Sequence, residues 1–343
     1  MGLCRAAHTN PQGAGDARPT TLQIIADEGL HDKLAEKTIV ITGATGGLGI
    51  EIVRALAATG ATLLLTGRDM AKAQQVLFDS GVVKAGPRVR IIQMDNASLG
   101  SVQTAAHAIL AALPRNQNGI NALICNVGMA GPPSHCHLTA DGHPCHYAVN
   151  NLSHFLLFQM LKHALLDGSS PEFPSLVMMV SSCSHRAVQH FQFGGEGYTN
   201  SKLAMIYMAS EIERRFGEPG VHATSVHPGI VITDLVHSVH PGMVKIMLGN
   251  EQLRVRLKSA EQGAATIVLA AVGSEWANKG GRYLENCEEA KPGKDDGDAL
   301  EEGFVRLTYD PEAEARLWEE SVAMVRVHMD VKGEEPGKNL DSR

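Results

Sequence analysis

Short, almost wholly apolar runs alternate with longer amphipathic stretches along most of the chain. Because a strand covered on both faces of a sheet carries few polar positions, the apolar runs predict strands over residues 38–42, 61–66, 89–94, 122–126, 176–181 and 223–226. The stretches between them predict helices over residues 48–58, 70–80, 98–113, 147–166, 198–216 and 260–272. Strands that alternate with helices of this length form parallel crossover units. The pattern therefore predicts an α/β fold, a doubly wound parallel sheet of the Rossmann type with helices on both faces.

The two ends of the chain depart from this alternation. Residues 1 to about 20 are rich in Gly, Ala, Asn and Pro without periodicity, which predicts disorder, whereas apolar positions over 22–30 predict a short segment that docks onto the body. A last strand is expected at 282–284, then an acidic exposed loop over 285–302 and a helix over 310–327 that packs on the core. We therefore expect a single domain over 37–284, a partly disordered N-terminal arm over 1–36, and an extension over 285–343 with a loose end.

Composition and charge narrow the class of protein. The 343 residues are 44% hydrophobic and 20% charged, which is typical of a globular chain. The net charge of -7 gives no attraction for phosphate backbones, so no nucleic-acid partner is expected. No apolar run has the length of a signal peptide or a membrane span, and the 6 cysteines lack the spacing of a disulfide framework. These features predict a cytoplasmic protein without a membrane span, whose cysteines are reduced thiols.

A glycine-rich turn follows the first predicted strand and precedes the first predicted helix. In the sequence Thr42-Gly-Ala-Thr-Gly-Gly-Leu-Gly49, Gly43 permits the tight turn, Gly47 lets the backbone approach a pyrophosphate, and Gly49 allows close packing of the helix. Thr45 and Leu48 belong to the same turn. A strand–helix turn without a ligand would need similar glycines, but the order of strand, turn and helix favours a dinucleotide cofactor.

The end of the second predicted strand indicates which dinucleotide binds. An acidic residue there would accept a hydrogen bond from the 2′-hydroxyl of NAD, whereas Arg68 offers donors for a 2′-phosphate, which favours NADP(H). The alternative is an arginine that merely caps an exposed strand end. Asp95 and Asn96 follow the third strand and are expected near the adenine, although an ordinary Asx turn would explain them too.

A tyrosine and a lysine at the start of one helix form a candidate proton-transfer pair. Tyr198 and Lys202 are four residues apart, so their side chains share a face. A phenol has a pKa of about 10, and a neighbouring ammonium should lower it towards the working pH. Lys202 can also reach hydroxyls of the cofactor.

Two further segments end predicted strands at the same edge of the sheet. Ser182 is placed to hydrogen-bond a substrate carbonyl oxygen, with Ser181 as the alternative. Pro228, Gly229 and Thr233 are expected to contact the nicotinamide carboxamide.

These motifs, in this order, resemble the short-chain dehydrogenase/reductase superfamily. The resemblance covers residues 37–284 and rests on the glycine turn, Cys125-Asn126-Val127-Gly128, Val149-Asn150, Ser182, the pair Tyr198 and Lys202, and Pro228-Gly229. The stretches 138–143, 148–155 and 201–204, with Leu317-Trp318, are most similar to the retinol dehydrogenase and WW-domain oxidoreductase branch.

The resemblance implies a role for each matching position. Tyr198 would be the general acid in reduction, Lys202 its pKa partner and Ser182 the residue that orients the carbonyl. Asn150 would hold a water that links Lys202 to solvent, and Asn126 and Gly128 would border the cofactor. Two departures from the family pattern are Cys125 in place of an asparagine and a longer interval between Ser182 and Tyr198.

The substrate is expected to be lipophilic. Apolar, methionine-bearing positions over 236–257 predict an adaptable lid near 234–258, although core packing explains them nearly as well. We therefore expect NADP(H)-dependent interconversion of a ketone or aldehyde and an alcohol, in the reductive direction, on a retinoid-like, steroid-like or polyketide-derived molecule. The alternatives are a cofactor-binding scaffold or sensor without turnover and a biosynthetic isomerase or cyclase.

Two other features carry less weight. The dense cluster of His135, Cys136, His137, His143, Cys145 and His146 fits no zinc spacing, so no metal is expected. The predicted helix over 198–216 is apolar on more than one side. Tyr207, Met208 and Ile212 are therefore either buried within the chain or in contact with a second subunit of a homodimer.

Overall fold

An eight-stranded sheet forms the centre of the protein, and it confirms the predicted doubly wound architecture. The structure is a computed structural model that describes residues 6–81, 88–115, 117, 119–131, 137–240 and 242–329. The strand order is β10-β9-β6-β5-β4-β1-β2-β3, and all neighbours are parallel except the first pair, β10 and β9. The strands are β1 (Thr38–Ile41), β2 (Thr62–Gly67), β3 (Val89–Gln93), β4 (Ala122–Cys125), β5 (Ser175–Val180), β6 (Val221–Val226), β9 (Arg282–Glu285) and β10 (Glu288–Glu289).

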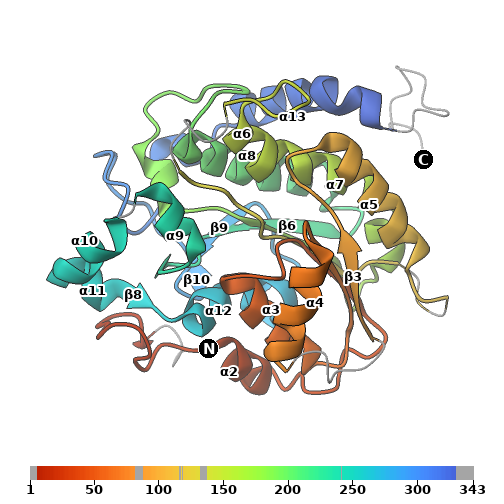
Figure 1. Cartoon of the computed structure of the whole chain (residues 1–343), viewed down its shortest axis with the longest axis horizontal. Coiled ribbons are helices and arrows are strands. Elements are labelled where there is room, and N and C mark those ends of the chain that lie inside the picture. Colours follow the sequence, from red (N-terminus) through yellow and green to blue (C-terminus); the bar gives the residue numbers. More distant parts are fainter. Residues whose placement is uncertain are drawn as a thin grey trace.

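Helices cover both faces of the sheet (Figure 1). One face carries α2 (Thr21–Asp27), α3 (Leu48–Ala57), α4 (Met70–Asp79) and α12 (Ala260–Val272). The other carries α5 (Leu99–Ala111), α7 (Ser153–Gly168) and α8 (Tyr198–Phe216), with α13 (Pro311–Val325) packed outside α8. Each face has its own hydrophobic cluster, and β1, β2, β4 and β5 are buried throughout.

The strand order reverses next to β1, whose neighbours are β2 on one side and β4 on the other. The crossover helices then leave in opposite directions, so the carboxyl ends of the strands open into a crevice at this switch point. The turns after β1, β4, β5 and β6 all reach this crevice, and they contain most of the motifs singled out from the sequence.

The predicted lid consists of short helices and a separate ribbon. It contains α9 (Asp234–Val239), α10 (Met243–Gly249) and α11 (Glu251–Arg256). A parallel two-stranded sheet flanks the three helices in the sequence: β7 (Ile230–Val231) precedes them and pairs with β8 (Leu257–Lys258), which follows them.

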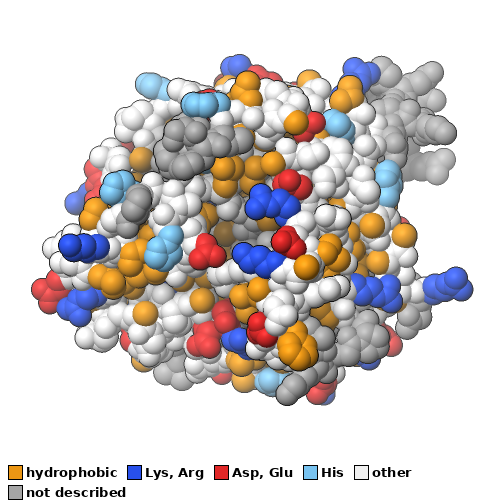
Figure 2. Space-filling model, viewed as in Figure 1, with side chains coloured by type: hydrophobic (Ala, Val, Ile, Leu, Met, Phe, Trp, Pro, Cys, Tyr) orange, Lys and Arg blue, Asp and Glu red, His pale blue; other side chains and the backbone are white. Residues whose placement is uncertain are grey.

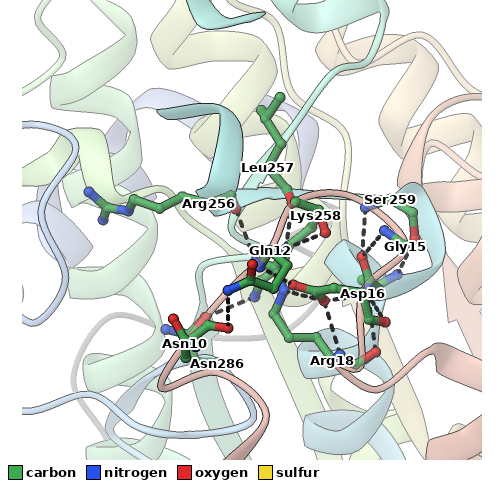
Figure 3. A network of polar contacts seen from close by, with 12 residues as sticks. Asn10, Gln12, Gly15, Asp16, Arg18, Arg256, Leu257, Lys258, Ser259 and Asn286 are labelled. Carbon is green, nitrogen blue, oxygen red and sulfur yellow. Dashed lines mark hydrogen bonds and ion pairs between the residues drawn. The ribbon is translucent and has the colours of Figure 1, made fainter. Parts of the chain in front are cut away.

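The N-terminal arm is packed against the lid and α12, which corrects the expected disorder for residues 6–20 (Figure 3). Arg18 is only 4% exposed, pairs with Asp16 at 2.8 Å, and donates to the backbone oxygens of Arg256 and Leu257. Gln262 of α12 in turn donates to the Asp16 and Arg18 backbone oxygens. The sequence of the arm could not show this, because the partners lie more than 200 positions away.

The outer face of α8 is buried within the chain. Tyr207, Met208 and Ile212 are 0%, 3% and 0% exposed, and α13 packs against α8. Of the two interpretations of these residues, burial within the chain is the one that the structure shows.

The cysteines require one correction. Cys125, Cys183 and Cys287 are buried thiols, but Cys145 is disulfide-bonded. Spacing along the chain does not report which sulfurs meet in space, so the expectation of reduced thiols throughout was wrong for Cys145. Within the described ranges, no helix is both long and apolar enough to cross a membrane.

Candidate active site

A cleft of about 610 Å³ lies at the carboxyl ends of the strands, between the start of α3 and the lid helix α9. Figure 2 shows a hollow near the middle of this face, bordered by basic and acidic side chains. The volume suits a small-molecule site. Most of the predicted site residues line it: Gly43, Thr45, Gly47, Leu48, Arg68, Asn126, Gly128, Ser182, Tyr198, Lys202, Pro228, Gly229 and Thr233.

The glycine turn has the shape of a cradle for a phosphate group. Gly43 and Gly47 have φ of +65° and +49°, a region that favours glycine. A Cβ on Gly49 would lie 2.0 Å from the Gly43 carbonyl oxygen, so the close approach of α3 to the turn requires glycine there. No side chain caps the N-terminus of α3, which leaves backbone N–H groups for an anion. These features fit the pyrophosphate of a dinucleotide.

Two cationic side chains line the cleft beyond the end of β2. Arg68 was predicted from the sequence, whereas Lys72, in the first turn of α4, was not. The neighbouring carboxylate of Asp69 accepts a hydrogen bond from the Lys72 backbone N–H as the N-cap of α4. The positive charges of Arg68 and Lys72 therefore suit a ligand phosphate.

Asp95 and Asn96 lie outside the cleft lining. Asp95 accepts from the Ala97 backbone N–H at 3.0 Å, which is an Asx turn. Asn96 is buried and its amide donates to the Ser153 hydroxyl at 2.8 Å. The Asn96 side chain therefore points into the protein, and its expected contact with adenine is not supported by this geometry.

Tyr198, Ser182 and Lys202 meet in the cleft. A hydrogen bond joins the Tyr198 and Ser182 hydroxyls, and the Lys202 Nζ lies 5.5 Å from the centre of the tyrosine ring. The Ser181 hydroxyl is buried and donates to the Lys202 backbone oxygen at 2.7 Å. Since that contact commits Ser181 to holding α8 in place, Ser182 is the serine that remains for a substrate.

Burial dominates the electrostatics of this pair. It raises the pKa of Tyr198 to about 12, and the hydrogen bond from Ser182 only partly offsets the shift. Burial also lowers the pKa of Lys202 to about 8. The expected lowering of the tyrosine pKa by Lys202 is therefore not seen in the chain without ligand, where burial outweighs it. The Lys202 ammonium donates to the Val180 backbone oxygen at 2.9 Å.

Asn150 lies in a π-helical turn, Ala148–Leu152, between the short helix α6 (Cys145–Tyr147) and α7. Its buried amide donates to the Met129 backbone oxygen at 3.0 Å and to the Ser201 hydroxyl at 2.8 Å, and its oxygen accepts from the Met129 N–H at 2.7 Å. Asn150 therefore links the segment after β4 to the start of α8, next to Lys202. The sequence predicted one continuous helix here and gave no sign of the π turn, which is a feature frequently found at functional sites.

The loop after β10 contributes to the cleft, which corrects its expected role as a purely exposed loop. Ala299 and Leu300 line the cleft. Arg186, 2% exposed, donates to the backbone oxygens of Lys294, Asp298, Glu302 and Gly303. The loop is therefore folded around one buried guanidinium that lies more than 100 positions earlier in the chain.

The histidine and cysteine cluster offers no assembled metal site among the described residues, which hold no group of three or more potential ligands. His135 and Cys136 lie outside the described residues. His146 is buried, and burial lowers its pKa.

Comparison with known proteins places these features in a family. The model of the short chain dehydrogenase family matches residues 37–243. The short-chain dehydrogenase/reductase prx1 of Penicillium roqueforti is 39% identical over 330 residues, 94% of each chain. The WW domain-containing oxidoreductase of Gallus gallus is 33% identical over 81% of this chain and 67% of its own. A Burkholderia cenocepacia short chain dehydrogenase, solved in complex with NADP, has a TM-score of 0.59 at 24% identity and covers 74% of this chain and 96% of its own.

The chain therefore belongs to the short-chain dehydrogenase family and is an oxidoreductase. The predicted resemblance, including its branch, is confirmed. Nicotinamide dinucleotides are the cofactors of this family, and the glycine turn described above fits them.

Replacing the buried Arg186 should release the loop that it holds. In Arg186→Met, four backbone oxygens lose their donor, so we expect trypsin to cleave after Lys294 at least about tenfold faster than in the native protein. Mass spectrometry of timed digests measures this. Arg282→Met, which changes an exposed arginine, is the matched control and should leave the cleavage rate unchanged. Equal cleavage rates for the two variants would show that Arg186 does not hold the loop.

Proposed function

We propose that this protein is an NADP(H)-dependent reductase that converts a ketone or aldehyde on a lipophilic small molecule to an alcohol. The observation that carries the proposal is the meeting of Ser182, Tyr198 and Lys202 in one cleft with the glycine turn. A scaffold without turnover would have no need for a phenol beside a buried ammonium in this arrangement.

The choice of NADP(H) is supported by charge. Arg68 and Lys72 both line the end of the cleft where the adenosine ribose would lie, and a 2′-phosphate would complement them. The Burkholderia relative bound NADP in its crystal structure, which agrees with this choice.

The proposed mechanism assigns one task to each side chain. The cofactor, when bound in the cleft, would supply the hydride for the carbonyl carbon. Tyr198 donates its hydroxyl proton to the carbonyl oxygen as negative charge develops there, and Ser182 donates a hydrogen bond to the same oxygen. The Lys202 ammonium stabilises the phenolate that remains on Tyr198. Asn150 supports the start of α8 through Ser201, and its role in holding a water stays a prediction.

The protonation state of Tyr198 is compatible with a role as the acid in reduction. With a pKa of about 12, Tyr198 keeps its proton at neutral pH and is ready to act as an acid. Alcohol oxidation would need the phenolate, which is scarce under the same conditions.

The walls of the cleft support an apolar substrate. Val127, Ile230, Leu235, Val236 and Leu300 line it from four different segments. An apolar body would be desolvated against them while its carbonyl reached Ser182 and Tyr198.

Removing the catalytic hydroxyl should abolish turnover without loss of cofactor binding. We expect Tyr198→Phe to lower kcat for NADPH-dependent reduction of an active ketone by at least about 100-fold, the range of general acid catalysis. Absorbance at the NADPH band follows the rate, and product mass should rise by two hydrogens. Tyr207→Phe on the same helix, whose hydroxyl donates to the Leu307 backbone oxygen away from the cleft, is the control. Wild-type turnover in Tyr198→Phe would refute the mechanism, and a product of unchanged mass would indicate an isomerase.

Cofactor preference should depend on Arg68. We expect Arg68→Ala to weaken NADPH binding about tenfold, through loss of a charge-assisted hydrogen bond, while NADH binding changes little. Titration of cofactor fluorescence measures both constants. Arg90→Ala, an exposed arginine on β3, should change neither. Equal losses for NADPH and NADH would show that Arg68 does not bind the 2′-phosphate.

The pH profile should report Lys202. Burial lowers its pKa to about 8, so its charge is present below that pH and lost above it, while Tyr198 remains protonated up to about 12. We expect kcat/KM for NADPH, which reports groups of the free enzyme, to be level near neutral pH and to fall above about pH 8. Thermal unfolding at each pH separates this from denaturation. A rate that rises steadily to pH 10 would contradict the assignment.

A further inference from the structure

A fully buried histidine of α7 lies between the glycine turn and Asn150. The His154 Nδ1 is 2.9 Å from the Asn150 backbone oxygen, and its Nε2 is 3.0 Å from the Thr42 hydroxyl. The Asn96 amide lies 3.5 Å from the same Nε2. No role for this residue follows from the proposed mechanism, although each of its contacts lies next to the site.

The partners fix the protonation of the ring. A backbone oxygen only accepts, so Nδ1 carries the hydrogen and Nε2 is the acceptor. Thr42 Oγ1 accepts from the backbone N–H groups of Asn126 and Val127, at 2.9 and 3.1 Å. Its own hydrogen has two acceptors in reach, Nε2 at 3.0 Å and the Ile124 backbone oxygen at 3.3 Å, and Nε2 is the nearer. Burial lowers the pKa of His154 to about 4, in agreement with a neutral ring.

Each ring nitrogen therefore serves a different part of the site. The Nε2 side holds Thr42, which begins the glycine turn and bonds to the segment after β4. The Nδ1 side holds the carbonyl of Asn150 in the π turn, and the Asn150 side chain reaches Ser201, next to Lys202. Both partners are fully buried, so no water could replace the hydrogen bond that each makes with the ring.

We propose that His154 is a positioning residue with two separable effects: through Nε2 it orders the glycine turn for the cofactor, and through Nδ1 it orders Asn150 and the start of α8 for proton transfer. The second effect rests on the proposed function, whereas the first concerns cofactor binding alone. A histidine that only filled space in the core would not divide its effects in this way.

Two amide variants separate the two contacts. The amide of Asn occupies nearly the place of Nδ1, so His154→Asn keeps the donor to Asn150 and loses the contact with Thr42. The amide of Gln reaches nearly the place of Nε2, so His154→Gln keeps an acceptor for Thr42 and loses the donor to Asn150. His154→Leu loses both.

The readouts are the NADPH dissociation constant from fluorescence titration without substrate, and kcat at saturating NADPH. We expect His154→Asn to weaken NADPH binding about tenfold and to keep kcat within about twofold, as for one lost buried hydrogen bond. His154→Gln should show the reverse, and His154→Leu should show both losses. The titration remains informative even if no reductase activity is found, so failure of the proposed function and failure of this inference can be told apart.

Two controls address stability. His163→Gln changes an exposed histidine of the same helix and should alter neither constant. Leu157→Ala removes buried volume from α7 and should lower the unfolding temperature without the split between binding and kcat. The proposal is overturned if the Asn and Gln variants lose binding and kcat in the same proportion, or if all three His154 variants lower only the unfolding temperature.

Discussion

The hydroxyl of Thr42 holds two central strands together at the point where the site is built. It accepts the N–H groups of Asn126 and Val127 at the end of β4, while its backbone begins the glycine turn at the end of β1. Buried polar groups at the ends of parallel strands have no water to bond with, so their partners must come from the protein. Thr42, with His154 and Asn150, satisfies these groups and places the glycine turn, the segment after β4 and α8 in a single framework.

The electrostatics of the cleft follow from the same burial. Desolvation favours the neutral form of both proposed catalytic groups, and it raises the pKa of Tyr198 while it lowers that of Lys202. A phenol that holds its proton suits a reductase. The ammonium donates to the carbonyl of Val180 and so remains beside the phenol without pairing with it. The protonation states of the two side chains therefore depend on their burial and on the Val180 carbonyl at the end of β5, as well as on the side chains themselves.

Segments far apart in the sequence are joined by arginines that donate to backbone oxygens. Arg18 joins the N-terminal arm to the lid, and Arg186 shapes the loop that brings Leu300 into the cleft. The guanidinium has five donors in a fixed fork, which suits several carbonyls at once. Arg256 extends this pattern, because it belongs to the lid and donates to the backbone oxygen of Leu300. Hydrogen bonds thus join the arm to the lid and the lid to the loop, and residues of the lid and the loop line the cleft.

The sequence by itself determined the elements that depend on local pattern. Apolar runs located the strands of the main sheet apart from β10. The glycine motif located the turn that lines one end of the cleft, and the spacing of Tyr198 and Lys202 placed both on one helix face. Such features follow from periodicity and from backbone preferences, which neighbouring residues express directly.

Only the tertiary structure decided the features whose partners are distant. The packed arm, the loop around Arg186 and the hydrogen bond of the Asn96 amide to Ser153 each depend on residues brought together by folding. The pKa of Tyr198 belongs to the same group, because desolvation is a property of the whole surrounding protein. A hydrogen-bond donor at one position carries no sign of an acceptor many residues away, and for that physical reason the pattern of the chain could not show these contacts.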